Sequence, residues 1–558
     1  MLKESRNTSK LFCYAMIMMM GFALHTPLLS ETFGPNSDEL NDLSYLFARA
    51  KLVLPQSSYP AHASDLLQLL RDLPLPSSDS DVYLYTKLQE RFSKNLGTQS
   101  AKVETIFAYE QRFRSKELLS DDSELKNGLD FQRNYLSLSP FFILNLDVEN
   151  YEGFSLGMSG NFRPLWANEY FRTSNIPDSL DFAYNLVERG ILDWNSPGTD
   201  MYIGRSPVHF GEASGSSLYP SKNIPFLDAI KIRVPIGAFS FDYLVSSVQP
   251  IKAKSPSPDV NPNQAALLDP SSKLLGEPYG FWNEPNPTLI VTAVHRFQWN
   301  FGPVKAGVGG TIIYARQNNL ISMTDVLPVI VWHNSNVKPN NLCLVLDATW
   351  AVLPGLTLSG QLGFDDINLA STLNVGDSAT PTIPAAIATL SYGKLLDKLQ
   401  LSLLSEFGYT HYLWGNFGYS PAELIGVDPL ERMIYRYTAD HGAVLLPLTS
   451  PYGPGAMWAS FSALCRDRER KLRYGFSFLA LSRNKSANLV TTLYTGDSAV
   501  KNADRSYTFA FDFPVSWDTK SIKVFTSPSI ILVDGSGSFS LSLGASSLWV
   551  PTRFFKLE

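Results

Sequence analysis

The chain has 558 residues, a formal net charge of −6 and 18% charged residues, below the ~25% of ordinary globular proteins. This acidic balance argues against a nucleic-acid partner, and a mean hydropathy of −0.05 is too polar for a bundle of membrane helices. The three cysteines, Cys13, Cys343 and Cys465, form no cluster with metal-ligand spacing, so we expect no metal site.

Residues 1–30 are predicted to form a signal peptide. The first residues carry Lys3, Arg6 and Lys10, and the apolar run LFCYAMIMMMGFAL follows. A cleavage site is expected near Ser30, and the alternative is an uncleaved anchor. No later segment supplies the ~20 consecutive apolar residues that a membrane-spanning helix needs. The protein is therefore expected to be exported and, if it spans a membrane, to span it with strands.

Residues 35–98 are predicted to form a small helical domain. Ser37 can cap the first helix, and Leu40, Leu43 and Phe47 recur at helical spacing after it. Further helical segments follow, ended by prolines and by a glycine. Their apolar stripes are expected to pack on one another, and no chemistry is assigned to them.

From about residue 101 the hydrophobic period changes from helical to two. In YTFAFDF, Tyr507 and Phe509 share one face while Thr508 and Ala510 share the other, and SFSLSLGA and LTLSGQLGF alternate in the same way. A sandwich would bury the apolar faces against each other, whereas a barrel would turn them to lipid. The polar faces are rich in Ser, Thr, Gly and Asp, which favours a barrel with a polar lumen.

The connections between these strands alternate in length, which is a second argument for a barrel. About 18 strand-like runs lie within residues 101–548, and residues 549–558 form a C-terminal tail. Short turns such as 150–153 and 235–237 follow even-numbered runs, whereas long polar segments follow odd-numbered ones. Outer-membrane barrels have short periplasmic turns and long outer loops. The predicted fold class is an all-β transmembrane barrel of about 18 antiparallel strands with an N-terminal α-helical domain.

The chain contains no sequence motif of a known class of active site. There is no G-x-S-x-G, Walker loop, H-E-x-x-H or GxGxxG after a strand. The seven histidines are scattered and lack a second metal ligand at the required spacing. We therefore expect a protein that is not an enzyme and that has no cofactor. This expectation rests on the absence of motifs alone, because catalytic triads assemble in space rather than in sequence.

Two long connections are candidate outer loops. The stretch IGRSPVHFGEASGSSLYPSKNIPFLDAIKI, residues 203–232, has glycines but no G-K-[ST] and no following helix signal, so a phosphate loop is not predicted. In segment 412–455, Asp428 can cap a short helix that would present Arg432 and Arg436 near the barrel mouth, unless these are ordinary solvated charges. Four tryptophans lie in or beside the outer loops, namely Trp166, Trp282, Trp332 and Trp414. They are expected to join the interfacial aromatic girdle, and the alternative is that they stack on the apolar faces of sugar rings.

With this layout the chain resembles the Wzi family of capsule-assembly outer-membrane proteins. The clearest motif is IGRSPVHFGEASGSSLYPSKNIPF, which is similar to a family segment where a strand ending in Gly-Arg leads through a Gly/Ser-rich turn to an Asn and then Pro-Phe. The corresponding residues here are Gly204, Arg205, Gly211, Ser217, Leu218, Asn223, Pro225 and Phe226. Phe210 stands where family members often have a tryptophan. DLSYLFARAKLVLPQSSYPAHASDLLQLL and GLTLSGQLGFDDI also resemble family segments.

The resemblance implies a lectin-like barrel that retains polysaccharide at the cell surface and is not an enzyme. An acidic polysaccharide would need cationic donors, best supplied by arginine. The candidate glycan-binding residues are Arg205, His209, Lys222, Asn223, Arg432 and Arg436. The expected location is the bacterial outer membrane, with the helical domain in the periplasm. The expected partners are the lipid bilayer, surface polysaccharide and the outer-membrane assembly machinery. The alternatives are a porin or nutrient-uptake channel, and an adhesin or structural surface barrel.

Overall fold

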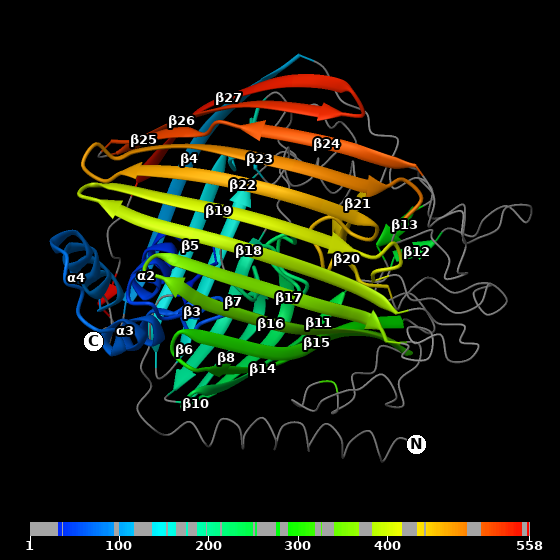
Figure 1. Cartoon of the computed structure of the whole chain (residues 1–558), viewed down its shortest axis with the longest axis horizontal. Coiled ribbons are helices and arrows are strands. Elements are labelled where there is room, and N and C mark those ends of the chain that lie inside the picture. The colour runs from blue at the N-terminus through cyan, green and yellow to red at the C-terminus, as the bar shows by residue number, and fades with distance from the viewer. Residues whose placement is uncertain are drawn as a thin grey trace, which may run out of the picture.

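The wall of the molecule is a closed antiparallel β-barrel of eighteen strands, with helices at one end (Figure 1). The computed structural model describes residues 32–35, 37–93, 100–115, 137–151, 154–162, 174–176, 187–196, 198–212, 215–248, 251–253, 275–278, 288–317, 325, 340–367, 382–415, 432–439, 442–487, 504–519, 521–549 and 555–556. The predicted signal peptide therefore lies outside the described residues.

The strands follow one another around the wall in chain order, and β27 pairs with β4 to close the barrel. Because β24 and β25 both lie between β23 and β26, they count as one interrupted strand. The strands are β4 (Ser100–Arg114), β5 (Phe142–Tyr151), β6 (Phe154–Phe162), β7 (Val187–Ser196), β8 (Thr199–Ser206), β10 (Leu227–Ile236), β11 (Phe239–Val248), β14 (Thr288–Asn300), β15 (Val304–Gln317), β16 (Asn340–Leu353), β17 (Leu356–Asp366), β18 (Ile383–Leu396), β19 (Leu399–Thr410), β22 (Ala456–Asp467), β23 (Leu472–Asn484), β24 (Arg505–Asp512), β25 (Val515–Asp518), β26 (Ile522–Val533) and β27 (Ser536–Trp549).

The alternation in the sequence decides which face of each strand turns outward. In β24, Tyr507 and Phe509 are 50% and 39% exposed, whereas Thr508 and Ala510 are 3% and 1% exposed. The exposed apolar side chains therefore form the outer surface, as a strand wall in hydrocarbon requires. Near the short turns, large aromatic side chains lie on this surface as a girdle at a membrane–water boundary does, namely Trp299, Trp350, Tyr474 and Trp517.

The connections confirm the predicted asymmetry between the two ends of the barrel. Only residues 237–238 join β10 to β11, and only residues 468–471 join β22 to β23, whereas residues 207–226 separate β8 from β10. We call the two ends the short-turn end and the long-loop end. The β26–β27 hairpin is an exception, because residues 534–535 make a tight turn at the long-loop end.

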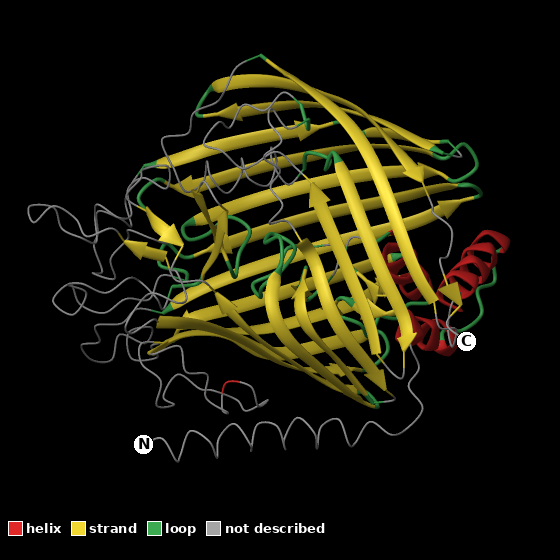
Figure 2. Ribbon diagram, turned by 180° about the vertical axis from the view of Figure 1, so that it is seen from behind, coloured by secondary structure: helices red, strands yellow, loops and turns green. Residues whose placement is uncertain are grey.

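The helices α2 (Asp38–Arg49), α3 (Ala63–Asp72) and α4 (Asp79–Ser93) pack together at the short-turn end (Figures 1 and 2). Ser37 caps α2 as predicted, since its hydroxyl accepts the Leu40 amide at 3.4 Å. Leu40, Leu66 and Phe92 are fully buried in the cluster that the helices share. None of the helices in the described ranges is long and apolar enough to cross a membrane.

Four small sheets complete the described part of the structure. They pair β1 (Thr32–Phe33) with β3 (Ala61–His62), β2 (Ser58–Tyr59) with β9 (His209–Phe210), β12 (Ile251–Ala253) with β13 (Leu275–Pro278), and β20 (Ile434–Ala439) with β21 (Gly442–Pro447). The helix predicted after Asp428 is wrong where the chain is described, because residues 434–439 form β20. Aromatic and β-branched residues favour a strand there, and β21 supplies a partner that outweighs the cap signal. Part of the predicted tail also returns to the wall, where β28 (Phe555–Lys556) pairs with β4.

Candidate functional site

Two of the long connections turn back into the barrel. Phe210, Leu218 and Tyr219, between β8 and β10, are fully buried, as are Trp414 and Leu448 between β19 and β22. They belong to one apolar cluster with inward-facing residues of the wall. Burial of each such side chain is favourable by roughly 1.5–3 kcal/mol, which a loop extended into water would not gain. The prediction that these connections project outward is therefore wrong for their described parts.

The N-terminal segment enters the lumen from the short-turn end and meets the first of these connections. β2 pairs with β9, which places Ser58 opposite Phe210 and Tyr59 opposite His209. The Lys231 ammonium on β10 donates to the carbonyl of the nearby Pro60 at 3.3 Å. We call the inward-folded segments together the plug, defined as residues 52–62, 207–212, 215–226, 411–415, 432–439 and 442–455.

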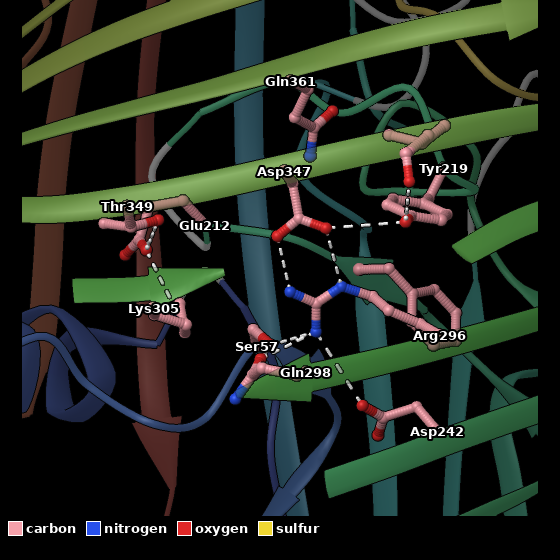
Figure 3. Close-up of polar contacts among 12 residues, drawn as sticks. Ser57, Glu212, Tyr219, Asp242, Arg296, Gln298, Lys305, Asp347, Thr349 and Gln361 are labelled. Carbon is pink, nitrogen blue, oxygen red and sulfur yellow. Dashed lines mark hydrogen bonds and ion pairs between the residues drawn. The ribbon is translucent and has the colours of Figure 1, made fainter. Parts of the chain in front are cut away.

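A buried guanidinium, that of Arg296 on β14, links the plug to the wall (Figure 3). It donates two hydrogen bonds to Asp347, from Nε to Oδ2 at 3.0 Å and from Nη2 to Oδ1 at 2.6 Å. Its Nη1 donates to the Ser57 hydroxyl at 2.6 Å and to the Gln298 amide oxygen at 2.7 Å. Asp242 lies 3.9 Å from the same nitrogen. A bidentate pair of this kind is strong and directional, so it holds the N-terminal segment at one position.

A second set of polar contacts fixes the Gly/Ser-rich turn of the first connection (Figure 3). The Lys305 ammonium donates to the Leu54 carbonyl at 3.0 Å and pairs with Glu212 at 3.4 Å. On the facing wall, Gln361 Oε1 accepts the Leu218 amide at 2.7 Å. The plug is therefore anchored to the wall by charges and amides as well as by apolar packing.

Asn223 joins the two inward-folded connections. Its Nδ2 donates to the carbonyls of Pro447 at 2.8 Å and Ser450 at 3.2 Å. Beside it, the Trp414 indole donates to the Thr449 carbonyl at 3.3 Å. The girdle position predicted for Trp414 is therefore wrong, and the other three tryptophans of that prediction lie outside the described residues.

The wall makes room for the Trp414 ring at Gly363 on β17. A Cβ at that position would lie 2.6 Å from the ring, closer than real side-chain contacts allow. The glycine that the sequence placed on a polar strand face therefore has a packing role.

Replacing Asn223 with alanine is expected to loosen the contact between the two connections. Two buried carbonyls would lose their donor, which costs about 1–3 kcal/mol each at most. Hydrogen exchange of the amides around Trp414 and Leu448 measures this, and we expect it to rise by at least tenfold. Asn300→Ala, in a turn at the opposite end, is the matched control and should leave that exchange unchanged. Equal exchange in Asn223→Ala and wild type would contradict the role given to Asn223.

The residues predicted to bind glycan whose side chains the structure describes do not gather at one site. Arg205 lies on the outer face of β8 beside the exposed Ile203. Its Nε and Nη2 donate to Asp228 at 2.6 and 2.8 Å, and its guanidinium lies 4.1 Å from the ring centre of Phe226. Arg432 is 2% exposed and lies inside the barrel with Asn223. Arg205 therefore contacts Asp228 and Phe226 near the end of β8, whereas Arg432 and Asn223 are buried among the inward-folded connections.

The remaining candidates also lie in the interior or outside the described side chains. The His209 Nε2 donates to the Glu212 carbonyl at 2.8 Å, because a carbonyl can only accept. Burial, with Lys222 nearby, lowers the pKa of His209 to about 3, so the imidazole is neutral. Burial also lowers the pKa of Lys222, which lines an internal cavity. The backbone of Arg436 pairs with Leu445, and its side chain lies outside the described part of the structure.

His62 links the helices to the wall at the short-turn end. Its Nε2 lies 2.7 Å from Asp200, and its Nδ1 lies 3.4 Å from Asp193, both at the β7–β8 hairpin. Burial by itself would lower the pKa of His62, but the carboxylates outweigh it and raise the pKa to about 10. The imidazolium is therefore charged at neutral pH and holds α3, which begins at Ala63, against the barrel.

Two internal cavities lie beside the plug. One, of about 300 Å³, lies between α2 and the inner wall, and Lys222 and Glu212 line it. The other, of about 700 Å³, follows the inner faces of β4 and of β24 to β27. Leu464 and Arg473 line both cavities, so the two adjoin.

The Arg296–Asp347 pair was not predicted from the sequence, although a signal for the arginine was present. In TLIVTAVHRFQWN, Arg296 shares a mixed face with Val294 and Gln298 and is the one charged residue on that face, opposite the apolar face of the strand. Such a charge on a membrane strand marks an interior site and needs a partner. Its partner Asp347 is two strands away in the barrel, a distance that no local pattern encodes.

No family model matches the chain, and no curated protein matches it. Among solved structures, the chain is similar to Wzi of Escherichia coli, described as an outer-membrane protein involved in group 1 capsule assembly and as a carbohydrate-binding β-barrel. That alignment has 13% identity and a TM-score of 0.58 and covers 94% of this chain and 100% of Wzi. Pseudomonas aeruginosa OprD and OccD3 (OpdP) also align, each with 8% identity over 81% of this chain, covering 96% and 92% of those chains at TM-scores of 0.39 and 0.40. From the closed wall and the alignment with Wzi, we conclude that the chain has the fold of an outer-membrane β-barrel, with eighteen strands arranged as in Wzi-like barrels.

Proposed function

We propose that the protein binds and retains polysaccharide at the bacterial cell surface and that it acts without catalysis. The observation that carries this proposal is the plug. Two connections from the long-loop end fill the lumen and meet the N-terminal segment around Arg296, which leaves little room for a wide pore. The likeness in fold to a carbohydrate-binding barrel adds support. In this proposal the long-loop end faces the cell exterior and the helices face the periplasm.

The alternative is a porin, which the unfilled cavity of about 700 Å³ beside the plug favours. Planar-bilayer recordings separate the two functions. The polysaccharide proposal expects no large steady single-channel steps from the wild-type protein, whereas a porin gives them. A structural barrel or adhesin would give neither steps nor glycan binding.

The direct test is binding of the purified full chain to immobilised hyaluronate, which is an acidic polysaccharide, and to neutral dextran. We expect retention on hyaluronate that weakens with added salt, because charge drives it. In cells, deletion of the protein should release surface polysaccharide into the medium, and expression of the full chain should restore it. Absence of binding to both polymers, together with unchanged retention in cells, would refute the proposal.

A further inference from the structure

The larger cavity has a wall of serine hydroxyls. Alternation in β26 and β27 leaves Ser527, Ser529, Ser540, Ser542 and Ser546 facing the cavity, where the two apolar side chains of β26 that also line it are Phe525 and Ile531. Each hydroxyl can donate one hydrogen bond and accept others. The wall therefore suits a ligand that carries many hydroxyl groups.

The charges that line this cavity are mainly basic. Arg112, Arg114, Arg473 and Lys523 lie there with two acidic residues, Glu110 and Asp512. Both acidic residues are already satisfied by the protein. Glu110 accepts from Arg112 at 2.8 Å and from the Ser139 amide at 2.8 Å, and Asp512 accepts from two serine hydroxyls at 3.0 and 2.7 Å. Arg112 and Arg473 also have carboxylate partners, in Glu110 and Asp38, whereas no ion pair joins Lys523 to a carboxylate in the described part of the chain.

The adjoining end of the lumen already holds a carboxylate. Arg473 donates to both oxygens of Asp38, at 3.0 and 2.7 Å, and Arg466 lies 3.1 Å from the same carboxylate. Asp38 belongs to the first turn of α2, so this carboxylate is supplied by a helix and not by a strand of the barrel. This contact shows that the basic side chains of this wall are placed to receive a carboxylate, and Lys523 lies further along the same cavity.

We infer that the cavity binds a small hydrophilic solute that carries one carboxylate, for which the hexuronate glucuronate is a suitable probe. The hydroxyls would meet the serine wall, and the carboxylate would meet Lys523, which lies across from Ser546. A volume of about 700 Å³ lies within the range of small-molecule sites. This site is inside the barrel and takes a small solute, so it is separate from the surface polysaccharide binding proposed above.

Calorimetric titration of the purified full chain tests the inference with glucuronate, glucose and acetate. Glucuronate should bind, and glucose and acetate should each bind at least roughly tenfold more weakly, since each lacks one half of the recognition. Lys523→Gln should weaken glucuronate binding roughly tenfold. Lys398→Gln is the matched control, because Lys398 pairs with Glu469 on an exposed turn. Equal binding of all three probes, no binding of glucuronate, or no effect of Lys523→Gln would overturn the inference.

A labelling experiment gives a second readout that does not depend on Lys523. Ser542→Cys is made in a Cys465→Ser background, where the remaining described cysteine, Cys343, is buried. A negatively charged methanethiosulfonate should react several-fold faster than a positively charged one, and glucuronate but not glucose should slow the reaction. Equal rates for the two reagents, no reaction with either, or no protection by glucuronate would overturn the inference. Either result leaves the hyaluronate test of the proposed function unaffected.

Discussion

Arg296→Ala is expected to release the plug from the wall while the barrel stays assembled. Removal of the guanidinium leaves the buried Asp347 carboxylate without its bidentate partner, and Ser57 loses a contact that holds the N-terminal segment. Breaking a buried ion pair by removing one partner costs about 3–5 kcal/mol. The variant should show single-channel openings in planar bilayers that the wild type lacks, and proteases should cut the plug segments.

The matched control is Arg205→Ala, which also removes an arginine from an ion pair. The Arg205 and Asp228 side chains are 29% and 51% exposed, so their pair contributes roughly 0–1 kcal/mol. This variant should keep the protease resistance and electrical behaviour of the wild type. If Arg296→Ala instead shows no channel openings and its plug segments resist proteases, the Arg296 network does not hold the plug. Apolar packing alone then accounts for the position of the plug.

The second large effect is expected from pH acting on His62. The pKa of His62 is raised from its ordinary 6.5 to about 10 in the folded protein. Its stabilising contribution is therefore complete below about pH 6.5 and is lost as the pH rises through about 10. A shift of this size corresponds to on the order of 5 kcal/mol. The helices should therefore detach from the barrel at a lower urea concentration at pH 10 than at pH 7.

His62→Gln separates this effect from general alkaline damage. Without the imidazolium, Asp193 and Asp200 repel each other at pH 7, so the variant should be weaker than the wild type there. The two proteins should converge between pH 10 and pH 11, because the wild type loses its charge as the pH rises through the His62 pKa of about 10. The measurement is the urea midpoint of the helical circular dichroism signal, followed from pH 6 to pH 11. Parallel curves with a constant offset would contradict the electrostatic role of His62.

Much of the wall could be predicted because its signal is local. Tyr507 and Phe509 face outward and Thr508 and Ala510 face inward, as their spacing indicates, since successive strand side chains point to opposite faces. The difference in length between the connections at the two ends could be predicted equally well, because turn lengths are counted directly along the chain. The Ser37 cap followed from a side chain acting on its own helix.

The candidate site was predicted poorly because its contacts join distant parts of the chain. The Gly/Ser-rich stretch, with Arg205 at its base, was expected to face the cell exterior. Most of the stretch instead lies inside the barrel, and Arg205 lies on the outer face of strand β8. Asn223 was predicted as a sugar ligand from its own segment, and no local pattern could show that it also donates to the carbonyls of Pro447 and Ser450. The cap signal at Asp428 predicted a helix where the neighbouring β21 draws the chain into a strand.

The sequence by itself determined the strand alternation, the apolar outer face, the serine-lined inner face and the helical N-terminal region, because each depends on residues within a few positions. Only the tertiary structure decided that the long connections fold inward. Phe210, Leu218 and Tyr219 leave water only where a closed wall supplies an apolar partner surface, and Arg296 is tolerated only where Asp347 lies opposite. The surrounding lumen therefore decides whether a polar loop with aromatic residues extends into water or folds inward and plugs the barrel.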